Sequence, residues 1–374
     1  MDAARSLEAV IAADRQRSEA DRRLTPEVVA GIRSAGLQRL MLNEADGGLA
    51  LPLPAALQVY ESLAGFDASV GWIVWNNALP CLFSRFLPAV TRADVFADAD
   101  WLHASSTRPS GKAVPEAGGY RLDGRWSLVS GCELAEWMPL TAMVTPADGG
   151  EPEMRYFFLR QSELTILDTW HVGGLRSTGS HDVVVEDFLV PTERSISPSD
   201  PSTASGPYGV IPIIATLALG MAAQFLGIAA SALAATTTLA VNKVSPGPTP
   251  DMRDRPDMQA GIASSNAAVA AARSHLHQNA TELWDLALTS ASFSATDIAA
   301  VFAASSHAIR TGTEVVDTMY SLAGTSAIYE KSPLERISRD MRVMRQHVLT
   351  QSLWPEQAGR IQLGLAADNP LFAV

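Results

Sequence analysis

The segment from Pro201 to Asn242 contains no charged side chain, and its second part, Ile211–Val241, is strongly apolar. A stretch of this length suits either a membrane span or a helix that other helices cover on every side. Ala, Gly and Thr are frequent in it, Gln224 interrupts it, and no basic and aromatic anchors flank it. We therefore expect an internal helix of a helical bundle.

The composition describes an ordered globular protein. The 374 residues are 47% hydrophobic and 18% charged, which is enough apolar material for two or three packed subdomains. The formal net charge of -12 disfavours a nucleic-acid role, since phosphate binding needs clustered Lys and Arg. Cys81 and Cys132 lie outside any metal-ligand spacing, so we expect two buried thiols and no metal. The charged N-terminus lacks a signal-peptide pattern, which predicts a cytoplasmic protein without a membrane segment.

Three zones follow one another along the chain. Residues 1–100 are expected to form an N-terminal helical domain, 101–212 a β domain, and 213–374 a C-terminal helical domain. Thr25-Pro26-Glu27 predicts a helix start, with a capping hydroxyl, Pro at the first helical position and an acid in the first turn. Asp123-Gly124 predicts the turn of a hairpin. The order of the zones indicates an α+β chain with more than one core.

The C-terminal zone carries Leu334-Glu-Arg, then Arg339-Asp, and finally Gln346-His347. This order resembles the C-terminal signature of the acyl-CoA dehydrogenase superfamily, where a Tyr-Glu pair supplies the carboxylate base at the last position. Here His347 replaces that carboxylate, which argues against desaturation. A His at this place resembles the flavin-dependent monooxygenases of the same fold, the two-component group D enzymes. The resemblance implies an N-terminal helical domain, a middle β-barrel or sandwich, and a C-terminal four-helix bundle.

Further segments carry the resemblance to the flavin site. Tyr120–Cys132 ends in Ser130-Gly131, where the monooxygenase branch also has Ser-Gly and the dehydrogenases have a Thr that contacts flavin N5. Trp170–Asp182 resembles the family's most specific Gly-rich motif, and Leu102–Gly111 resembles the loop that meets the flavin pyrimidine. The resemblance thus implies these cofactor-binding residues: Ser106, Thr107, Ser130, Arg176, Thr178 and Ser180.

The substrate side rests on one helix and one histidine. Gly71–Asn77 resembles the family's pocket-shaping helix, in which some relatives place a His a few residues further on. This chain offers Asn76 and Asn77, whose amides orient a polar group but do not act as a base at neutral pH. Trp75 is placed to stack on an aromatic substrate. We add His103 as a candidate pocket residue.

The resemblance implies the oxygenase component of a two-component flavin-dependent monooxygenase. Such an enzyme uses reduced flavin and O2, through a flavin C4a-hydroperoxide, to oxygenate a small aromatic or heteroaromatic molecule. By this resemblance, Ser130 would hydrogen-bond with flavin N5. His347 would stabilise the peroxide or activate the substrate, since an imidazole pKa near neutrality suits either role. The family's Arg-x-x-Phe-Gly segment for FAD is replaced by Asn242-Lys243-Val-Ser-Pro-Gly, which favours FMN and leaves FAD open.

The resemblance also implies partner proteins, and two alternative functions remain open. No Gly-x-Gly-x-x-Gly follows a strand, so a separate NAD(P)H:flavin reductase is expected to supply the flavin, and the resemblance implies a homotetramer. An acyl-CoA dehydrogenase with its base relocated to Glu330 or Glu335 is one alternative. A non-catalytic family member that only binds a ligand is another. The sequence alone leaves both open.

Overall fold

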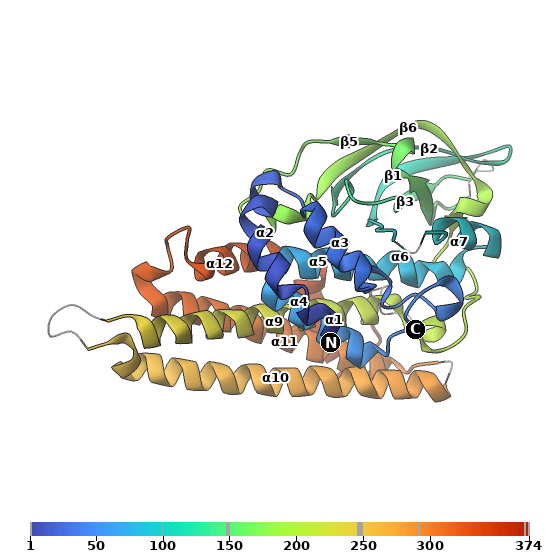
Figure 1. The fold of residues 1–374 in the computed structure, drawn as a ribbon. Coiled ribbons are helices and arrows are strands. Elements are labelled where there is room, and N and C mark those ends of the chain that lie inside the picture. The colour runs from blue at the N-terminus through green and yellow to red at the C-terminus, as the bar shows by residue number, and fades with distance from the viewer. Residues whose placement is uncertain are drawn as a thin grey trace.

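The computed structural model describes residues 2–98, 100–146, 150–244, 250–290, 292–369 and 372. A layer of long helices lies beside a β layer, and the N-terminal helices lie against both (Figure 1). The helices before the strands are α1 (Asp2–Arg5), α2 (Glu8–Asp21), α3 (Pro26–Ser34), α4 (Leu53–Phe66), α5 (Ala68–Asn76), α6 (Ala78–Phe83) and α7 (Ala89–Val95). The helices after the strands are α8 (Pro207–Val210), α9 (Ile213–Asn242), α10 (Pro256–Thr289), α11 (Ala295–Ala323), α12 (Pro333–Met344) and α13 (Leu353–Gln362).

The uncharged stretch forms α9, which is the central helix of the bundle. It contacts α4, α5, α10, α11 and α12. Its length and hydropathy are those of a membrane span, but 78% of its most apolar window is buried inside the protein. Gly227 allows the close approach of α4, because a Cβ at this position would lie 2.0 Å from the Glu61 carbonyl oxygen. The expectation of an internal bundle helix is therefore met.

The N-terminal and C-terminal helices share one hydrophobic core. Leu57 and Tyr60 of α4 are buried in the same cluster as Phe225 of α9 and Phe302 of α11. The start of α3 is as expected, since the Thr25 hydroxyl accepts a hydrogen bond from the Val28 N–H. Both cysteine thiols are free and buried, as the composition suggested.

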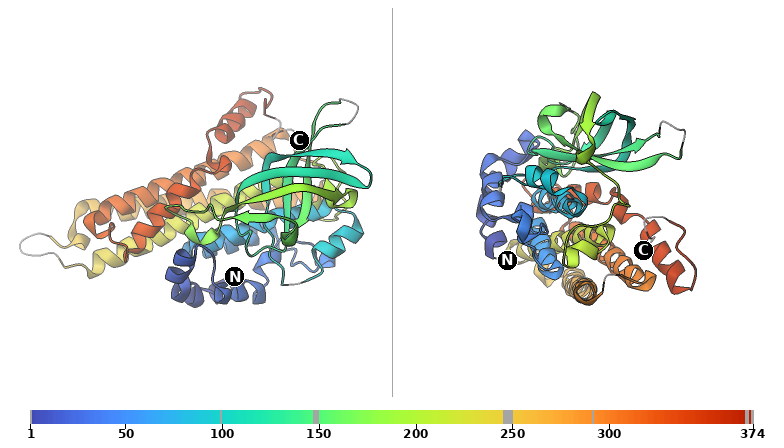
Figure 2. Two further views of the ribbon diagram at one scale, coloured as in Figure 1. Left: turned by 90° about the horizontal axis from the view of Figure 1, so that it is seen from above. Right: turned by 90° about the vertical axis from the view of Figure 1, so that its right-hand side faces the viewer.

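The strands form one sheet in the order β5-β6-β2-β1-β3-β4-β7, antiparallel except for the parallel pair β1–β3. They are β1 (Ser106–Glu116), β2 (Gly119–Val129), β3 (Trp137–Val144), β4 (Glu153–Arg160), β5 (Thr165–Leu167), β6 (His181–Pro191) and β7 (Ser195–Ile196). The sheet curls over a second core, since β4 and β6 touch although three strands separate them in the order. Figure 2 shows this β layer on one side of the stacked helices.

The predicted turn at Asp123-Gly124 is wrong. Strand β2 continues through it, with Gly124 paired to Gly111 of β1, and the chain reverses at Gly118 with φ +86°. Gly124 serves packing instead of a turn, because a Cβ there would lie 2.7 Å from the ring of Trp126. That indole is fully buried and fills the space that the two glycines leave.

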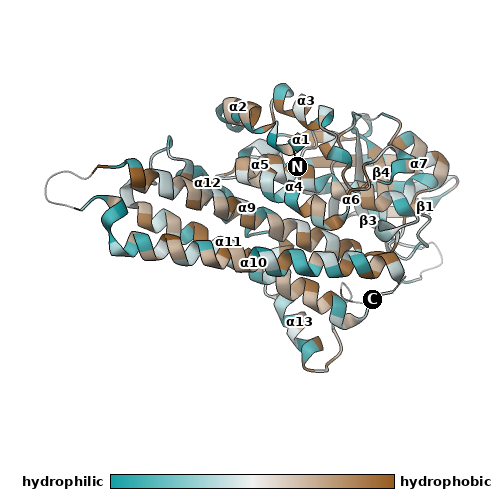
Figure 3. Cartoon of the chain, turned by 60° about the horizontal axis from the view of Figure 1, so that its bottom comes forward, coloured by the Kyte–Doolittle hydropathy of each residue, from teal (hydrophilic) through white to brown (hydrophobic). Residues whose placement is uncertain are grey.

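The last helix of the bundle ends before the histidine that the resemblance singles out. Helix α12 ends at Met344, so His347 lies in the connection after it and not on the helix. There His347 begins a new short turn, Val348–Thr350, because its ring Nδ1 accepts a hydrogen bond from the Leu349 N–H. Helix α13 then projects from the bundle, as Figure 3 shows.

Candidate active site

One edge of the sheet gathers most of the residues expected to bind the cofactor. Strand β2 runs antiparallel to both β1 and β6, so the end of β2 lies beside the beginnings of the other two strands. Val129 pairs with His181, and the β2–β6 register shifts between Trp126 and Val129. This bulge turns the end of β2, and Ser130 follows it directly. The sheet edge therefore faces α5, which contacts the loop before β6.

Three buried hydroxyl groups meet at this edge. The Ser130 Oγ lies 2.8 Å from the Ser180 Oγ, which lies 2.6 Å from the Thr178 Oγ1. Thr178 in turn donates to the carbonyl oxygen of Leu175 at 2.9 Å. The backbone joins the same segments, since the Gly131 N–H donates to the Thr178 carbonyl. Residues that the resemblance placed at the flavin thus form one hydrogen-bonded chain.

Trp72 completes the chain from the helical side. Its indole Nε1–H donates to the Ser130 Oγ at 3.0 Å. Helix α5 holds it there, with Asp67 capping the helix by accepting from the Ser69 and Val70 N–H groups. Trp72 lies in the Gly71–Asn77 segment that resembles the pocket-shaping helix, but its sequence position alone indicates no contact with Ser130. A donor on α5 reaching the strand end depends on tertiary packing, so no local pattern could have identified it.

His347 lies against two tryptophans. Its ring makes edge contacts with Trp72 and Trp75, with centroids 5.4 Å and 5.7 Å away. Burial lowers the pKa of His347 to about 4, so the ring is neutral at physiological pH. Nδ1 accepts from the Leu349 N–H, which leaves the proton on Nε2. Nε2 has no hydrogen-bond partner among the described residues, so it is a free donor.

The other expected pocket residues form hydrogen bonds or ring contacts with neighbouring residues of the protein. The Trp75 Nε1–H donates to the Leu217 carbonyl of α9, and its ring is tilted against that of Trp72, with the centroids 5.3 Å apart. Asn77 is buried, donates to the Ile73 carbonyl and accepts from the His103 N–H. His103 stacks on Trp101 at 4.2 Å, and burial lowers its pKa to about 3. Asn76, at the end of α5, is half-buried.

The remaining expected flavin residues occupy different surroundings. Ser106 is buried at the start of β1, where its carbonyl accepts from the Thr141 hydroxyl, and Thr107 beside it is exposed. Arg176 binds backbone, donating to the Glu19 and Val172 carbonyls. This matches a role in holding the loop between Trp170 and His181.

A buried ionic network supports the site from behind. Arg336 of α12 donates to Asp67 at 2.8 Å and lies 3.5 Å from Asp340. Asp340 accepts from the Leu175 N–H at 2.7 Å, and Leu175 is in the left-handed region with φ 50°. Desolvation raises the pKa of Asp340 to about 7. The network joins the start of α5, the loop that carries Thr178, and the helix that leads to His347.

The chemistry of this edge fits an isoalloxazine ring. The ring is a flat, mostly apolar surface with a nitrogen edge, and a hydroxyl can hydrogen-bond with that edge. Ser130 provides the hydroxyl, and Leu128 provides an unusual apolar surface beside it. Leu128 is 54% exposed although it belongs to a strand, and its φ is +64° in the bulge. Ser130, Thr178 and Ser180 would hold the flavin, with Leu128 covered by it.

The relocated-base alternative loses support from the geometry. Glu335 forms an ion pair with Arg339 at 2.7 Å, and Arg339 also reaches Glu19. Glu330 is exposed. Neither carboxylate belongs to the cluster around Ser130 and His347.

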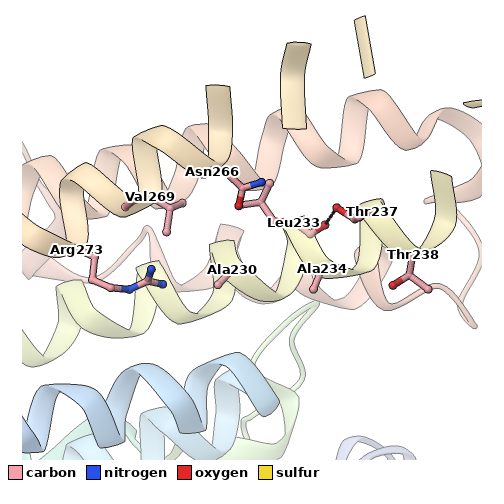
Figure 4. Close-up of a pocket in the computed structure, with 9 residues that line it drawn as sticks. Ala230, Leu233, Ala234, Thr237, Thr238, Asn266, Val269 and Arg273 are labelled. Atoms are coloured by element: carbon pink, nitrogen blue, oxygen red, sulfur yellow. Dashed lines mark hydrogen bonds between the residues drawn. The ribbon is translucent and has the colours of Figure 1, made fainter. Parts of the chain in front are cut away.

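The molecule also has a hollow away from this edge, between α9 and α10. It measures about 650 Å³ and is open to solvent. Figure 4 shows Ala230 and Ala234 on one helix facing Val269 and Arg273 on the other. None of the residues that line it belongs to the sheet edge.

Comparison with known proteins supports the resemblance to the acyl-CoA dehydrogenase superfamily. Residues 219–352 match the model of the acyl-CoA dehydrogenase C-terminal domain. The indole-3-acetate monooxygenase of Pseudomonas putida is 26% identical over 92% of this chain and 88% of that protein. The oxygenase component of an FADH(2)-dependent resorcinol hydroxylase from Rhizobium sp. is 27% identical, over 89% of this chain and 86% of its own. The C-terminal helices therefore match the acyl-CoA dehydrogenase family, and about nine tenths of the chain is similar to a monooxygenase and to a hydroxylase oxygenase component.

The fold is also similar to that of a solved flavin-binding protein. XiaF from Streptomyces sp., solved in complex with FADH2 and glycerol, superposes with a TM-score of 0.92. It is 28% identical, and the match covers 99% of this chain and 96% of that one.

Proposed function

We propose that this protein is the oxygenase component of a two-component monooxygenase that hydroxylates a small aromatic or heteroaromatic molecule. The observation that carries the proposal is the pairing of a neutral His347 donor with the Ser130 hydroxyl, both in contact with Trp72. Bound reduced flavin supplies the two electrons that activate O2. Everything else in the reaction depends on residues of this chain.

Ser130 would hydrogen-bond with the nitrogen edge of the flavin, and Thr178 and Ser180 would hold the Ser130 hydroxyl in place. With Nδ1 accepting from the Leu349 N–H, the neutral His347 ring carries its proton on Nε2 and acts as a hydrogen-bond donor. Beside a bound flavin, this N–H would stabilise negative charge that develops on oxygen. A ring in this state favours donation to oxygen over deprotonation of the substrate. Trp72 and Trp75 exclude water from the reacting oxygen.

The walls of the site support an aromatic substrate. Trp72 and Trp75 are both at least 92% buried, and each offers a flat apolar surface next to His347. The named substrates of the two curated relatives, indole-3-acetate and resorcinol, are aromatic. We therefore favour ring hydroxylation.

The cofactor and the partners follow from the same relatives. We propose reduced flavin supplied by a separate NAD(P)H:flavin reductase, since one relative is named as an oxygenase component. The altered Asn242–Gly247 segment favours FMN, whereas XiaF and the resorcinol hydroxylase are named with FADH2. We further propose a homotetramer in the cytoplasm. The α9–α10 hollow, lined by small side chains, suits helix packing between subunits.

The test supplies photoreduced FMN or FAD and O2 to the protein without any reductase, over a panel of phenols and indoles. We expect hydroxylated product from at least one aromatic compound, and tighter binding of one flavin. His347→Ala should lower product yield by about tenfold or more and release hydrogen peroxide instead, while flavin still binds. Bleaching of tightly bound oxidised FAD by an acyl-CoA, without oxygenated product, would establish the dehydrogenase alternative.

A further inference from the structure

The hydrogen-bond chain at the sheet edge has a single allowed direction. The indole N–H of Trp72 is a donor only, so Ser130 accepts at that contact. At the other end the Leu175 carbonyl is an acceptor only, so Thr178 donates its one hydroxyl proton to that carbonyl. Both ends of the chain are therefore fixed by groups that cannot reverse their roles.

The two middle contacts follow by elimination. Thr178 has no proton left, so Ser180 donates to it across the 2.6 Å contact. Ser180 then has no proton left either, so Ser130 donates to Ser180 across the 2.8 Å contact. The order is Trp72 N–H to Ser130, Ser130 to Ser180, Ser180 to Thr178, and Thr178 to the Leu175 carbonyl.

The direction of the chain is anchored in the buried part of the protein. Leu175 adopts the left-handed conformation, and its N–H is held by the Asp340 carboxylate at 2.7 Å. Its carbonyl also accepts from the Thr178 N–H and from the Trp170 indole. Ser130, Ser180 and Thr178 are each at most 6% exposed, so water does not compete for their protons.

We propose that this chain makes Ser130 a hydrogen-bond acceptor toward the flavin and thereby selects the reduced cofactor. N5 of reduced flavin carries a hydrogen and donates, whereas N5 of oxidised flavin has only a lone pair. Because the Ser130 proton is donated to Ser180, the Ser130 oxygen can accept a hydrogen bond from N5–H of reduced flavin. The N5 lone pair of oxidised flavin finds no donor at Ser130. Ser180 and Thr178 are positioning residues, and the inference rests on the flavin site proposed above.

The test measures the dissociation constants of oxidised and photoreduced flavin anaerobically, using FMN and FAD, for wild type and variants. Wild type should bind the reduced form more tightly. Ser180→Ala and Thr178→Val each release the Ser130 proton, which can then donate to oxidised N5. In both variants the ratio of the oxidised to the reduced dissociation constant should fall by about tenfold, the factor equivalent to ~1.4 kcal/mol. The midpoint potential of the bound flavin should fall by ~30 mV with it.

Two controls separate direction from the mere loss of a contact. Trp72→Phe removes a hydrogen bond to Ser130 but leaves its proton on Ser180, so the ratio should persist. Thr178→Ser keeps the hydroxyl and should also preserve it. An unchanged ratio in folded Ser180→Ala or Thr178→Val, or an equal fall in Trp72→Phe, overturns the inference. Failure of wild type to bind either form of flavin instead refutes the proposed function.

Discussion

At the scale of the single residue, His347 shows how surroundings decide what a side chain does. Its position in the sequence indicated chemistry, and a free imidazole with a pKa near neutrality would suit an acid or a base equally. In the structure the half-buried ring contacts Trp72 and Trp75, and desolvation lowers its pKa to about 4. The neutral tautomer with a proton on Nε2 is then the working form.

This state predicts how oxygen transfer depends on pH. Desolvation lowers the pKa of His347 from 6.5 to about 4, so in the folded protein the ring stays neutral until the pH falls toward about 4. The ratio of product yield between wild type and His347→Gln should therefore stay constant from about pH 5.5 to pH 8. Product yield with photoreduced flavin measures it. An inflection in that ratio near pH 6.5 would show that His347 titrates as an ordinary base.

At the scale of the element, the sequence predicted what depends on local pattern and failed where packing intervened. The uncharged stretch indicated α9, and Thr25 indicated the start of α3, because burial and capping leave local signatures. The turn predicted at Asp123-Gly124 was wrong because Gly124 makes room for the ring of Trp126, which lies two residues further along the same strand. The position of His347 after the end of α12 also depends on its surroundings, since its ring caps the next turn.

The site shows the same limit. Ser130, Thr178 and Ser180 were found because they lie in motifs that are continuous in sequence. The contact of Trp72 with Ser130 joins residues that are 58 positions apart, and that of Leu175 with Asp340 spans 165. Contacts over such separations are made by the tertiary fold, so single-sequence reasoning has no signal for them.

Gly124→Ala tests the packing explanation for β2. A Cβ at residue 124 would lie 2.7 Å from both the Gly111 Cα and the Trp126 ring, so the substitution should cost ~1–3 kcal/mol of unfolding free energy. Gly359→Ala on α13 is the matched control, because no atom lies within 4 Å of its added Cβ. It should be neutral or stabilising. Urea denaturation measures both, and equal effects would refute the role of the Trp126 ring.

At the scale of the whole molecule, the buried ionic network connects parts of the chain that are distant in sequence. Arg336 lies between Asp67 of α5 and Asp340 of α12, and Asp340 holds Leu175 in the loop before β6. Both carboxylate side chains are at most 8% exposed. The N-terminal helices, the β layer and the bundle therefore meet at one charged centre behind the hydroxyl chain.

Removing the central cation should destabilise the entire protein. Arg336→Met leaves Asp340 buried without its ion-pair partner, and we expect a loss of ~3–5 kcal/mol at pH 8. The pKa of Asp340 is already raised to about 7, above its unfolded value, so the folded state binds more protons and unfolding free energy falls as pH rises through that window. Without Arg336 the pKa rises further, so the loss should be smaller at pH 5 than at pH 8. Arg336→Lys keeps a positive charge and should lose less. Chemical denaturation at both pH values decides this, and a loss that is independent of pH, or equal for Met and Lys, would show that Arg336 acts through packing alone.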